Sequence, residues 1–356
     1  MIPDHVTLHR RARQLLPSAV YDYYAGGAGR ERTLRANERA WRQVWLAPRV
    51  LTGARPADTS TRLLGTPVAT PVCVAPTGFQ RLAHPDGELA TAAGAARAGA
   101  LFVLSTRSSS RIEAVAEAVA AGGGAWWFQV YIMRDRELTA SLVRRAAAAG
   151  AAALVLTADT PVVGRKRRDS ASLVIPDADL EANTGPLADP AASEQAADLT
   201  FADIGWLSGL SGGLPVVVKG VLRGDDARAC RAAGAAAVIV SNHGGRQLDG
   251  AVPAVMALPP VLAALRALDD GAPAYLDGGI RTGDQVLAAL ALGAGAVFLG
   301  RPALWALACG GAAAVTALLT GLTADLAHSM TLAGAASLAD VSGLARTSWG
   351  PGQGQG

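Results

Sequence analysis

The sequence predicts an α/β fold in which eight parallel strands close into a (β/α)8 TIM barrel. Eight short apolar runs recur along the chain, and Ala-rich stretches of helical length separate most of them. Each run is continuously apolar rather than alternating, which indicates strands buried on both faces, as in a parallel sheet covered by helices. The strands are expected at Val72–Pro76, Leu101–Thr106, Trp126–Tyr131, Ala153–Asp159, Pro215–Gly220, Ala237–Asn242, Pro273–Gly279 and Ala296–Arg301.

A doubly wound open sheet is the alternative fold. Such a sheet usually carries a GxGxxG turn after its first strand, but here that turn reads Ala-Pro-Thr-Gly-Phe-Gln. The barrel is therefore favoured, and its stretch has the usual barrel length of about 250 residues. The helices between strands are expected at Asp86–Ala98, Arg111–Ala121, Asp135–Ala149 and Gly283–Leu292, among others.

The whole chain, 1–356, is predicted to form one domain with three parts. Residues 1–70 form an N-terminal cap of helices and loops, residues 71–330 form the barrel, and residues 331–356 form a C-terminal tail. One connection is unusually long: after the fourth strand, residues of about 160–199 are acidic and rich in Pro and Gly. A loop of this length in a compact domain is typical of a lid over a site.

Composition excludes several other classes of protein. With 51% hydrophobic and 17% charged residues, the chain is not disordered, and a net charge of +3 gives no reason to expect a nucleic-acid partner. Cys73, Cys230 and Cys309 are far apart, so neither a disulfide nor a metal site is expected, and a cytoplasmic location is favoured. The apolar stretch 303–324 has the length of a membrane span, but Gly310 and Gly311 interrupt it, so we expect no membrane association.

Polar or glycine-rich residues follow nearly every predicted strand. The active sites of barrels lie at the carboxyl ends of their strands, and a barrel does not need such residues there for stability. Strand ends can be polar simply because they meet water, but that accounts for one or two positions rather than eight. The residues are Pro76, Thr77 and Gly78; Ser105; Gln129 and Tyr131; Thr157 and Asp159; Lys219; Ser241 to Arg246; Asp277, Gly279 and Arg281; Gly300 and Arg301.

A flavin mononucleotide (FMN) across the barrel mouth accounts for this set of residues. Glycines after strands seven and eight let backbone N–H groups approach a phosphate, and Arg281 and Arg301 add guanidinium groups suited to its oxygens. Lys219 would be a costly buried cation unless it faced an electron-rich partner such as a reduced flavin. The neutral groups that could meet the edge of the flavin ring are Ser105, Gln129 and Thr157.

His243 is the candidate base. Most single histidines are structural, but this one follows a strand in a glycine-flanked loop, three residues before Arg246. Asp159 ends a strand two positions away in the barrel, and a carboxylate beside a histidine raises the pKa of the imidazole and orients its ring. Tyr23 and Tyr131 could be packing residues, although Tyr23 precedes a Gly-Gly turn from which its phenol could reach the barrel mouth.

The motifs resemble those of the FMN-dependent 2-hydroxy acid oxidases and dehydrogenases, which oxidise glycolate, lactate or mandelate. The resemblance covers nearly the whole chain and is most specific in SNHGGRQLDG, and HGGRQLDGAVP is similar to hydroxymandelate oxidases in particular. The other matching segments are weaker alone but occur in the family's order. They are YDYYAGGA, APTGFQRLAHPDGE, FQVY, LTADTP, VVVKG, DGGIR and GR.

The resemblance implies a role for each matching residue. His243 would be the catalytic base, Asp159 would orient it, Arg246 would bind the substrate carboxylate, and Tyr23 and Tyr131 would contact the substrate. Lys219 would lie at the flavin N1 edge. The remaining FMN contacts would be Pro76, Thr77, Gly78, Ser105, Gln129, Thr157, Ser241, Asp277, Gly279, Arg281, Gly300 and Arg301.

Two departures from the family pattern concern the substrate. Lys166 stands where the family usually has a second carboxylate-binding arginine; Arg165, Arg167 or Arg168 could substitute for it, or the whole run could be a solvated charged segment. Arg107 stands where relatives often carry an aromatic or small residue that faces the substrate. An arginine there suggests a polar or anionic distal group, or a role in product binding.

The reaction implied is oxidation of an (S)-2-hydroxy acid, aryl or bulky as in mandelate, to the 2-oxo acid. The electrons would pass to O2 or to another acceptor, and relatives are often tetramers, which implies a homo-oligomer. An FMN-dependent tailoring enzyme acting on a larger, peptide-linked or carrier-linked hydroxy acid is the first alternative. A phosphate-binding isomerase or lyase and a non-catalytic flavin protein are the others.

Overall fold

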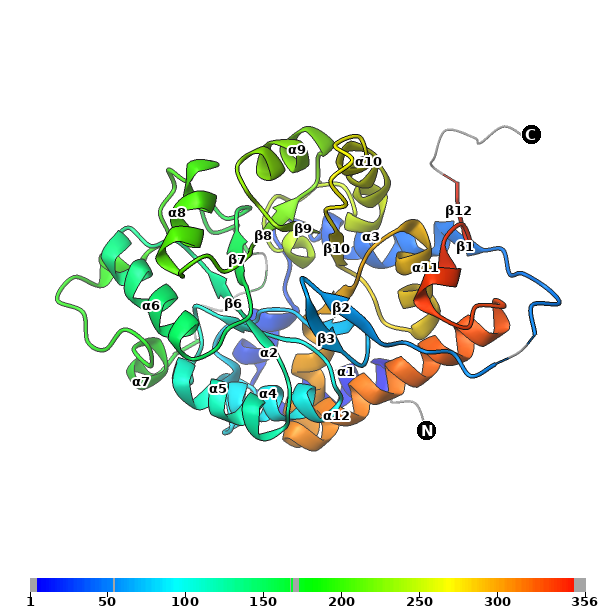
Figure 1. Cartoon of the computed structure of the whole chain (residues 1–356). Coiled ribbons are helices and arrows are strands. Elements are labelled where there is room, and N and C mark those ends of the chain that lie inside the picture. Colours follow the sequence, from blue (N-terminus) through cyan, green and yellow to red (C-terminus); the bar gives the residue numbers. More distant parts are fainter. Residues whose placement is uncertain (1–4, 54, 167, 169–172, 349–356) are drawn as a thin grey trace.

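The computed structural model describes residues 5–53, 55–166, 168 and 173–348, and its centre is a closed barrel of eight parallel strands (Figure 1). The strands follow one another around the barrel in chain order, and β11 closes it by pairing with β4. The (β/α)8 prediction is therefore confirmed. The strands are β4 (Val72–Val74), β5 (Phe102–Ser105), β6 (Trp126–Val130), β7 (Leu154–Thr157), β8 (Val216–Val221), β9 (Ala237–Val240), β10 (Ala274–Asp277) and β11 (Val297–Leu299).

Both faces of the strands are buried, as the continuous apolar runs predicted. One set of alternate residues fills the barrel, where the Trp127 ring lies 5.9 Å from the Tyr275 ring and 6.0 Å from the Phe298 ring. The other set packs against the surrounding helices. These helices form a ring in Figure 1: α4 (Gly87–Arg97), α5 (Ile112–Ala121), α6 (Arg136–Ala148), α8 (Ala202–Leu210), α9 (Gly224–Ala232), α10 (Ala254–Arg266), α11 (Gly283–Leu292) and α12 (Arg301–Leu332).

The cap contains strands as well as the expected helices. Helices α1 (His5–Leu15), α2 (Ser18–Ala25) and α3 (Arg32–Ala40) and the short helix η1 (Trp41–Gln43) are followed by β1 (Val44–Leu46). A hairpin of β2 (Thr61–Leu63) and β3 (Thr66–Val68) then places Leu63 and Val68 in the core inside the barrel. The hairpin leads directly into the amino-terminal end of β4, and its side chains Leu63 and Val68 pack against the residues inside the barrel. The hairpin therefore covers the amino-terminal end of the barrel.

The end of the helical part of the cap meets the C-terminal part of the described chain in a second small sheet. β1 pairs antiparallel with β12 (Ala345–Thr347), with Val44 opposite Thr347 and Leu46 opposite Ala345. The short helix η5 (Leu338–Val341) leads into β12. Of the predicted tail, residues 349–356 lie outside the described residues.

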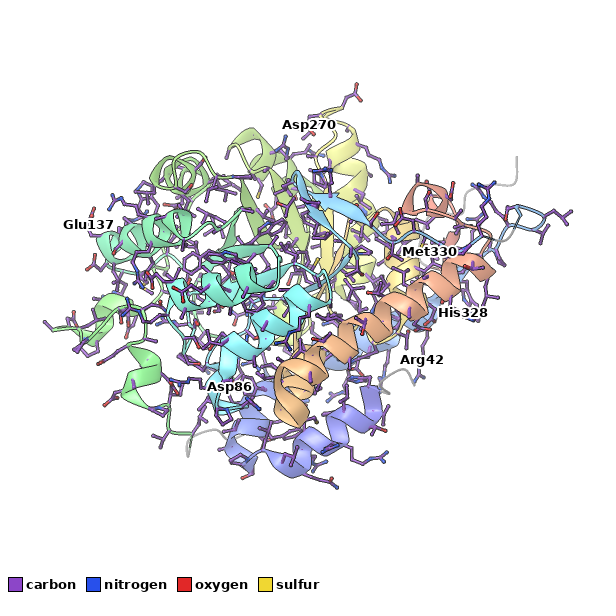
Figure 2. The ribbon with its side chains drawn as sticks, turned by 60° about the horizontal axis from the view of Figure 1, so that its bottom comes forward. Arg42, Asp86, Glu137, Asp270, His328 and Met330 are labelled. Carbon is purple, nitrogen blue, oxygen red and sulfur yellow. The ribbon has the colours of Figure 1, made fainter. Side chains whose placement is uncertain are left out.

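Helix α12 is long and apolar enough to span a membrane, and half of its most apolar window is buried inside the structure. It crosses the outside of the barrel beside α4 and α1 (Figure 2). The backbone leaves helical geometry at Gly310 and Gly311, as the sequence predicted. Near its end Met330 is buried whereas His328, two residues earlier, is exposed, so the helix has a packed face and a polar face.

In the described part of the long connection after β7, the helical elements are a short helix, α7 (Asp177–Leu180), and one turn of helix, η3 (Pro190–Ser193). Single bridges join it to the rest of the chain at both ends, Ala28 to Lys166 and Met133 to Gln195. Further along, the Arg145 Nη1 donates to the Asn183 carbonyl at 2.6 Å. The segment is thus tied to the cap and to the region around α6.

Candidate active site

A cavity of about 880 Å³ lies at the carboxyl ends of the strands, beneath α2 and the connection after β7. Most residues that the sequence singled out line this cavity, and they come from widely separated parts of the chain. They are Tyr23, Pro76, Thr77, Gly78, Ser105, Arg107, Tyr131, Thr157, Lys166, Lys219, His243, Arg246, Asp277, Gly279, Arg281, Gly300 and Arg301. Asp159, Gln129 and Ser241 lie just behind the wall and hydrogen-bond to residues that form it.

The His243 ring is fixed by Asp159. The His243 Nδ1 lies 3.0 Å from the Asp159 Oδ1, and the His243 backbone N–H donates to the Ser241 Oγ at 3.0 Å. With Nδ1 protonated toward the carboxylate, Nε2 is the nitrogen free to accept a proton. His243 has φ of 56°, a left-handed conformation that is costly for a residue with a Cβ and is often found at functional sites.

The pKa of His243 shifts in the direction opposite to the one expected from its neighbour alone. Burial lowers the pKa of His243 below its ordinary value, and this effect outweighs the Asp159 carboxylate, which raises it; Lys219 lowers it further. Burial raises the pKa of Asp159, but the interactions with His243 and the positive charge of Lys219 together outweigh it, so the pKa of Asp159 is also lowered. At neutral pH the pair is therefore a neutral imidazole beside a carboxylate.

Two cations meet at one side of the cavity. The Lys166 Nζ donates to the Arg246 carbonyl at 2.6 Å, and the Arg246 Nη1 donates to the Tyr23 carbonyl at 2.7 Å and to the Gly26 carbonyl at 3.0 Å. The Arg246 guanidinium also stacks over the Tyr23 ring, 5.3 Å from its centroid. Burial, with repulsion from Arg246 and Arg301, lowers the pKa of Lys166 to about 8.

Among the described cations of its run, Lys166 is the one that lines the cavity. Arg165 is exposed, and Arg168 bonds to Glu31 at 2.9 Å and to Asp22 at 3.3 Å, which ties it to the cap. Arg167 lies outside the described residues. The run is therefore not simply a solvated charged face.

A buried network links the strands that the flavin would cover. The Lys219 Nζ donates to the Ser241 Oγ at 2.8 Å and lies 3.1 Å from the Asp277 Oδ2, to which the Ser241 Oγ donates at 2.8 Å. The Asp277 Oδ1 is buried and has no partner among the described residues. The carboxylate therefore has one oxygen committed to Lys219 and one available to a ligand hydroxyl.

The neutral groups form a second network on the neighbouring strands. The Gln129 Nε2 donates to the Thr157 Oγ1 at 3.0 Å, and its Oε1 accepts from the Ser105 Oγ at 3.0 Å and from the Thr106 N–H at 3.2 Å. These bonds hold Ser105 and Thr157 in the cavity wall, where they can meet a polar ring edge.

The opposite end of the cavity fits a phosphate. Arg301 is partly buried, and among the described residues its guanidinium donates to the carbonyls of Tyr24, Gly26 and Gly244 at 3.0–3.1 Å. Burial and repulsion from Arg246 and Arg281 lower the pKa of Arg301 to about 9. The Arg281 Nε is buried without a partner among the described residues. An anion here would relieve both features, so the residues present fit FMN.

Close backbone packing explains one of the glycines at this end. Gly279 has φ of 76°, and a Cβ on it would lie 2.3 Å from the Asn37 carbonyl oxygen. Only glycine lets the loop after β10 pass so close to α3 while its backbone faces the cavity.

Sequence reasoning missed several residues of this site. Tyr24 lines the cavity, and its Oη donates to the Phe79 carbonyl at 2.5 Å. Gln247 lies in the same motif as His243, and its Nε2 donates to the Asp159 carbonyl at 3.0 Å. Glu38 pairs with the Arg281 Nη2 at 2.7 Å. Tyr24 and Gln247 stand beside residues that were singled out; Glu38 carried no local signal.

The comparisons with known proteins agree with this geometry. The family model described as FMN-dependent dehydrogenase matches residues 12–346. The chain is 44% identical to an L-lactate oxidase of Nostoc sp. over 346 residues, covering 93% of this chain and 94% of the relative. It is 41% identical to glycolate oxidase 1 of Zea mays over 344 residues, covering 93% and 91% of the two chains.

Solved structures extend the likeness to the fold. The crystal structure of mandelate oxidase with (S)-2-phenylpropionate is similar with a TM-score of 0.88 and 40% identity, covering 98% of each chain. The family is named for its FMN cofactor, for which the cavity has fitting residues. The isomerase or lyase alternative is thereby excluded, and the chain belongs to the FMN-dependent dehydrogenase family, whose members here are 2-hydroxy acid oxidases acting on CH–OH groups.

Proposed function

We propose that the chain oxidises (S)-2-hydroxy acids with an aryl or bulky side chain, as in mandelate, to the corresponding 2-oxo acids. The observation that carries this proposal is the partly buried His243–Asp159 pair, whose histidine lines the same cavity as Arg246 and Lys166. A base held beside two cations is the arrangement that oxidation of a hydroxy acid requires, because the carboxylate is held while a proton is removed.

In the proposed reaction Arg246 and Lys166 hold the substrate carboxylate. Tyr23 and Tyr131 stay protonated and can donate hydrogen bonds, because burial raises the pKa of both phenols. FMN held by the cavity residues would supply the acceptor for the two electrons.

His243 Nε2 takes up the proton that the oxidation releases, and the Asp159 carboxylate stabilises the imidazolium that forms. Lys219, held by Ser241 and Asp277, places a positive charge where the cofactor ring becomes negative.

The rim of the cavity supports a bulky substrate. Val162 and Val163 line the cavity yet are 71% and 73% exposed, which places apolar side chains at its entrance. An apolar rim at the entrance is suited to an aryl group.

Anaerobic bleaching of the flavin tests this function directly. The purified protein is expected to be yellow, to release one FMN per chain, and to be bleached by (S)-mandelate faster than by glycolate. Visible spectra and mass spectrometry of the released cofactor provide the measurement. A flavoprotein that no 2-hydroxy acid bleaches would contradict the proposal.

The pH dependence should report Lys166. Its ammonium is charged below pH 8 and neutral above it, so substrate binding should weaken and kcat/KM should fall as pH rises through about 8. On the acid side kcat/KM should fall only below the ordinary histidine pKa, because the pKa of His243 is lowered. Lys166→Arg is expected to remove the alkaline fall and to lower KM for simple hydroxy acids.

The control for this profile is Arg165→Lys, since Arg165 is exposed beside Lys166. This variant should keep the wild-type profile. An alkaline limb that survives in Lys166→Arg would assign the titration to another group.

We further propose a cytoplasmic homo-oligomer, a tetramer by analogy with relatives, in which electrons pass from the flavin to O2 or to another acceptor. The free Cys73, Cys230 and Cys309 support a reducing compartment, and the exposed Trp45 (69%) and Leu51 (102%) support a contact between subunits. Light scattering that gives a monomer mass would contradict the oligomer.

A further inference from the structure

Arg107 is a cation in the cavity wall that has no acidic partner among the residues the structure describes. It follows β5, lines the cavity, and uses its Nη2 to donate to the Ser193 carbonyl at 2.6 Å. No described carboxylate lies within 4.0 Å of its guanidinium, and burial lowers the pKa of Arg107. A largely buried charge of this kind is costly unless a ligand compensates it.

Three other cations of the cavity are already paired with carboxylates. Arg134 pairs with Glu194 at 2.9 Å, Lys219 with Asp277 at 3.1 Å and Arg281 with Glu38 at 2.7 Å. Arg107, in contrast, forms no ion pair with a described carboxylate.

The unpaired cations other than Arg107 are accounted for by the proposed function. Arg301 lies at the phosphate end, while Arg246 and Lys166 lie together and would share the carboxylate next to the oxidised carbon. Neither the cofactor nor the common part of a 2-hydroxy acid supplies an anion for Arg107.

The positive charges of Arg107 and Arg246 both influence the same two phenols, those of Tyr23 and Tyr131. Both arginines lower the pKa of Tyr23 and that of Tyr131, in opposition to burial, which raises them. The two phenols are therefore within electrostatic reach of both guanidinium groups. A substrate whose carboxylate Arg246 holds would therefore lie in a cavity whose wall also carries both phenols and the Arg107 guanidinium.

We propose that Arg107 binds a second oxyanion at the distal end of the substrate, so that the preferred substrate is a 2-hydroxy acid whose side chain ends in a carboxylate or similar group. This inference rests on the proposed function. The guanidinium can hold such a group by two parallel hydrogen bonds while its Nη2 keeps the bond to Ser193.

Matched substrates test the proposal. The pairs are 4-carboxymandelate with 4-carbamoylmandelate and 2-hydroxyglutarate with 2-hydroxyhexanoate, which differ in distal charge and sample two side-chain lengths. The wild type should favour the charged member of at least one pair by about tenfold or more in kcat/KM, the usual effect of a charged hydrogen bond. Arg107→Met should reduce this ratio to about one, and Arg107→Lys should keep part of it.

Arg134→Met is the matched control, because Arg134 also lines the cavity but is paired with Glu194. It should keep the wild-type ratio. If neither pair shows a preference in the wild type, or if Arg107→Met slows all four substrates equally, Arg107 only fastens the connection after β7 and the inference is overturned.

Product binding gives a readout that does not depend on turnover. Calorimetric titration with 2-oxoglutarate and 2-oxohexanoate, and with 4-carboxybenzoylformate and 4-carbamoylbenzoylformate, should show the same charge preference, lost in Arg107→Met. The absence of that preference overturns the inference. Flavin bleaching by unsubstituted mandelate or lactate distinguishes failure of this inference from failure of the proposed function. Bleaching without a preference for the charged substrates contradicts only the role of Arg107. If no hydroxy acid bleaches the flavin, the proposed oxidation itself is contradicted.

Discussion

Replacing His243 with Gln is expected to lower the rate of flavin reduction by about 10²–10⁴-fold, because the reaction loses its base. The amide cannot take up the proton that His243 Nε2 accepts, although it can still hydrogen-bond to Asp159. FMN content should be unchanged, since the residues proposed to hold the cofactor are others. Anaerobic stopped-flow measurement of flavin bleaching by (S)-mandelate gives the rate.

His328→Gln provides the control, because His328 is exposed on α12, outside the cavity (Figure 2). It should reduce its flavin at the wild-type rate. If His243→Gln also does so, then the base is a different group and the assignment of the whole His243–Asp159 pair is wrong.

Replacing Lys219 with Met is expected to destabilise the protein by about 3–5 kcal/mol, because it leaves the Asp277 carboxylate buried without its cation. Lys219 and Asp277 are both nearly inaccessible, at 4% and 7% exposed, so solvent cannot compensate the charge. Adding Asp277→Asn to the variant should recover part of the lost stability, since the uncompensated charge is then removed. Thermal unfolding of the two variants and the wild type, with their flavin contents, provides the measurement.

An exposed ion pair supplies the comparison. Arg223 pairs with Asp225 on the surface, so Arg223→Met should leave the melting temperature nearly unchanged. A single Lys219→Met variant as stable as the wild type would show that Asp277 is not left as an uncompensated buried charge.

The barrel could be predicted because each strand is buried on both faces. A run such as that around Val103 or Val217 has no alternative environment in a soluble domain, so local composition alone identified all eight strands. The predicted runs extend beyond the observed strands by one to three residues in most cases. At the carboxyl ends the extra residues follow the last paired residue of the strand and make other bonds: Asp159 pairs with His243, and the Asn242 amide donates to Asn37 and to the Val252 carbonyl.

The β2–β3 hairpin could not be predicted, since each strand has three residues and one of them is Pro67. Its burial depends on Leu63 and Val68 meeting the open end of a barrel that the chain has not yet formed at that point of the sequence.

Some polar residues of the site could be predicted from the sequence, whereas their partners could not. His243 and Arg246 were identifiable because they share one short motif at a strand end. The pairing of Arg168 with Glu31 joins residues 137 positions apart, and the bond from Arg107 to Ser193 spans 86. Sequence periodicity reports which face a residue occupies, and it carries no information on such partners.

The cap is synthesised first, but its strand β1 can pair only after β12, near the other end of the described chain, has been made. Tyr23 leaves the ribosome 223 residues before Arg246, whose guanidinium fixes its carbonyl. At about 5–20 residues per second this delay is on the order of 10–40 s. Throughout that time the cap has neither Arg246 nor Arg301 to hold it, and β1 has no partner strand before residues 345–347 are made. A nascent chain therefore lacks part of the cavity wall until Arg301 has been synthesised, so binding of the cofactor in the complete cavity cannot precede the eighth strand of the barrel.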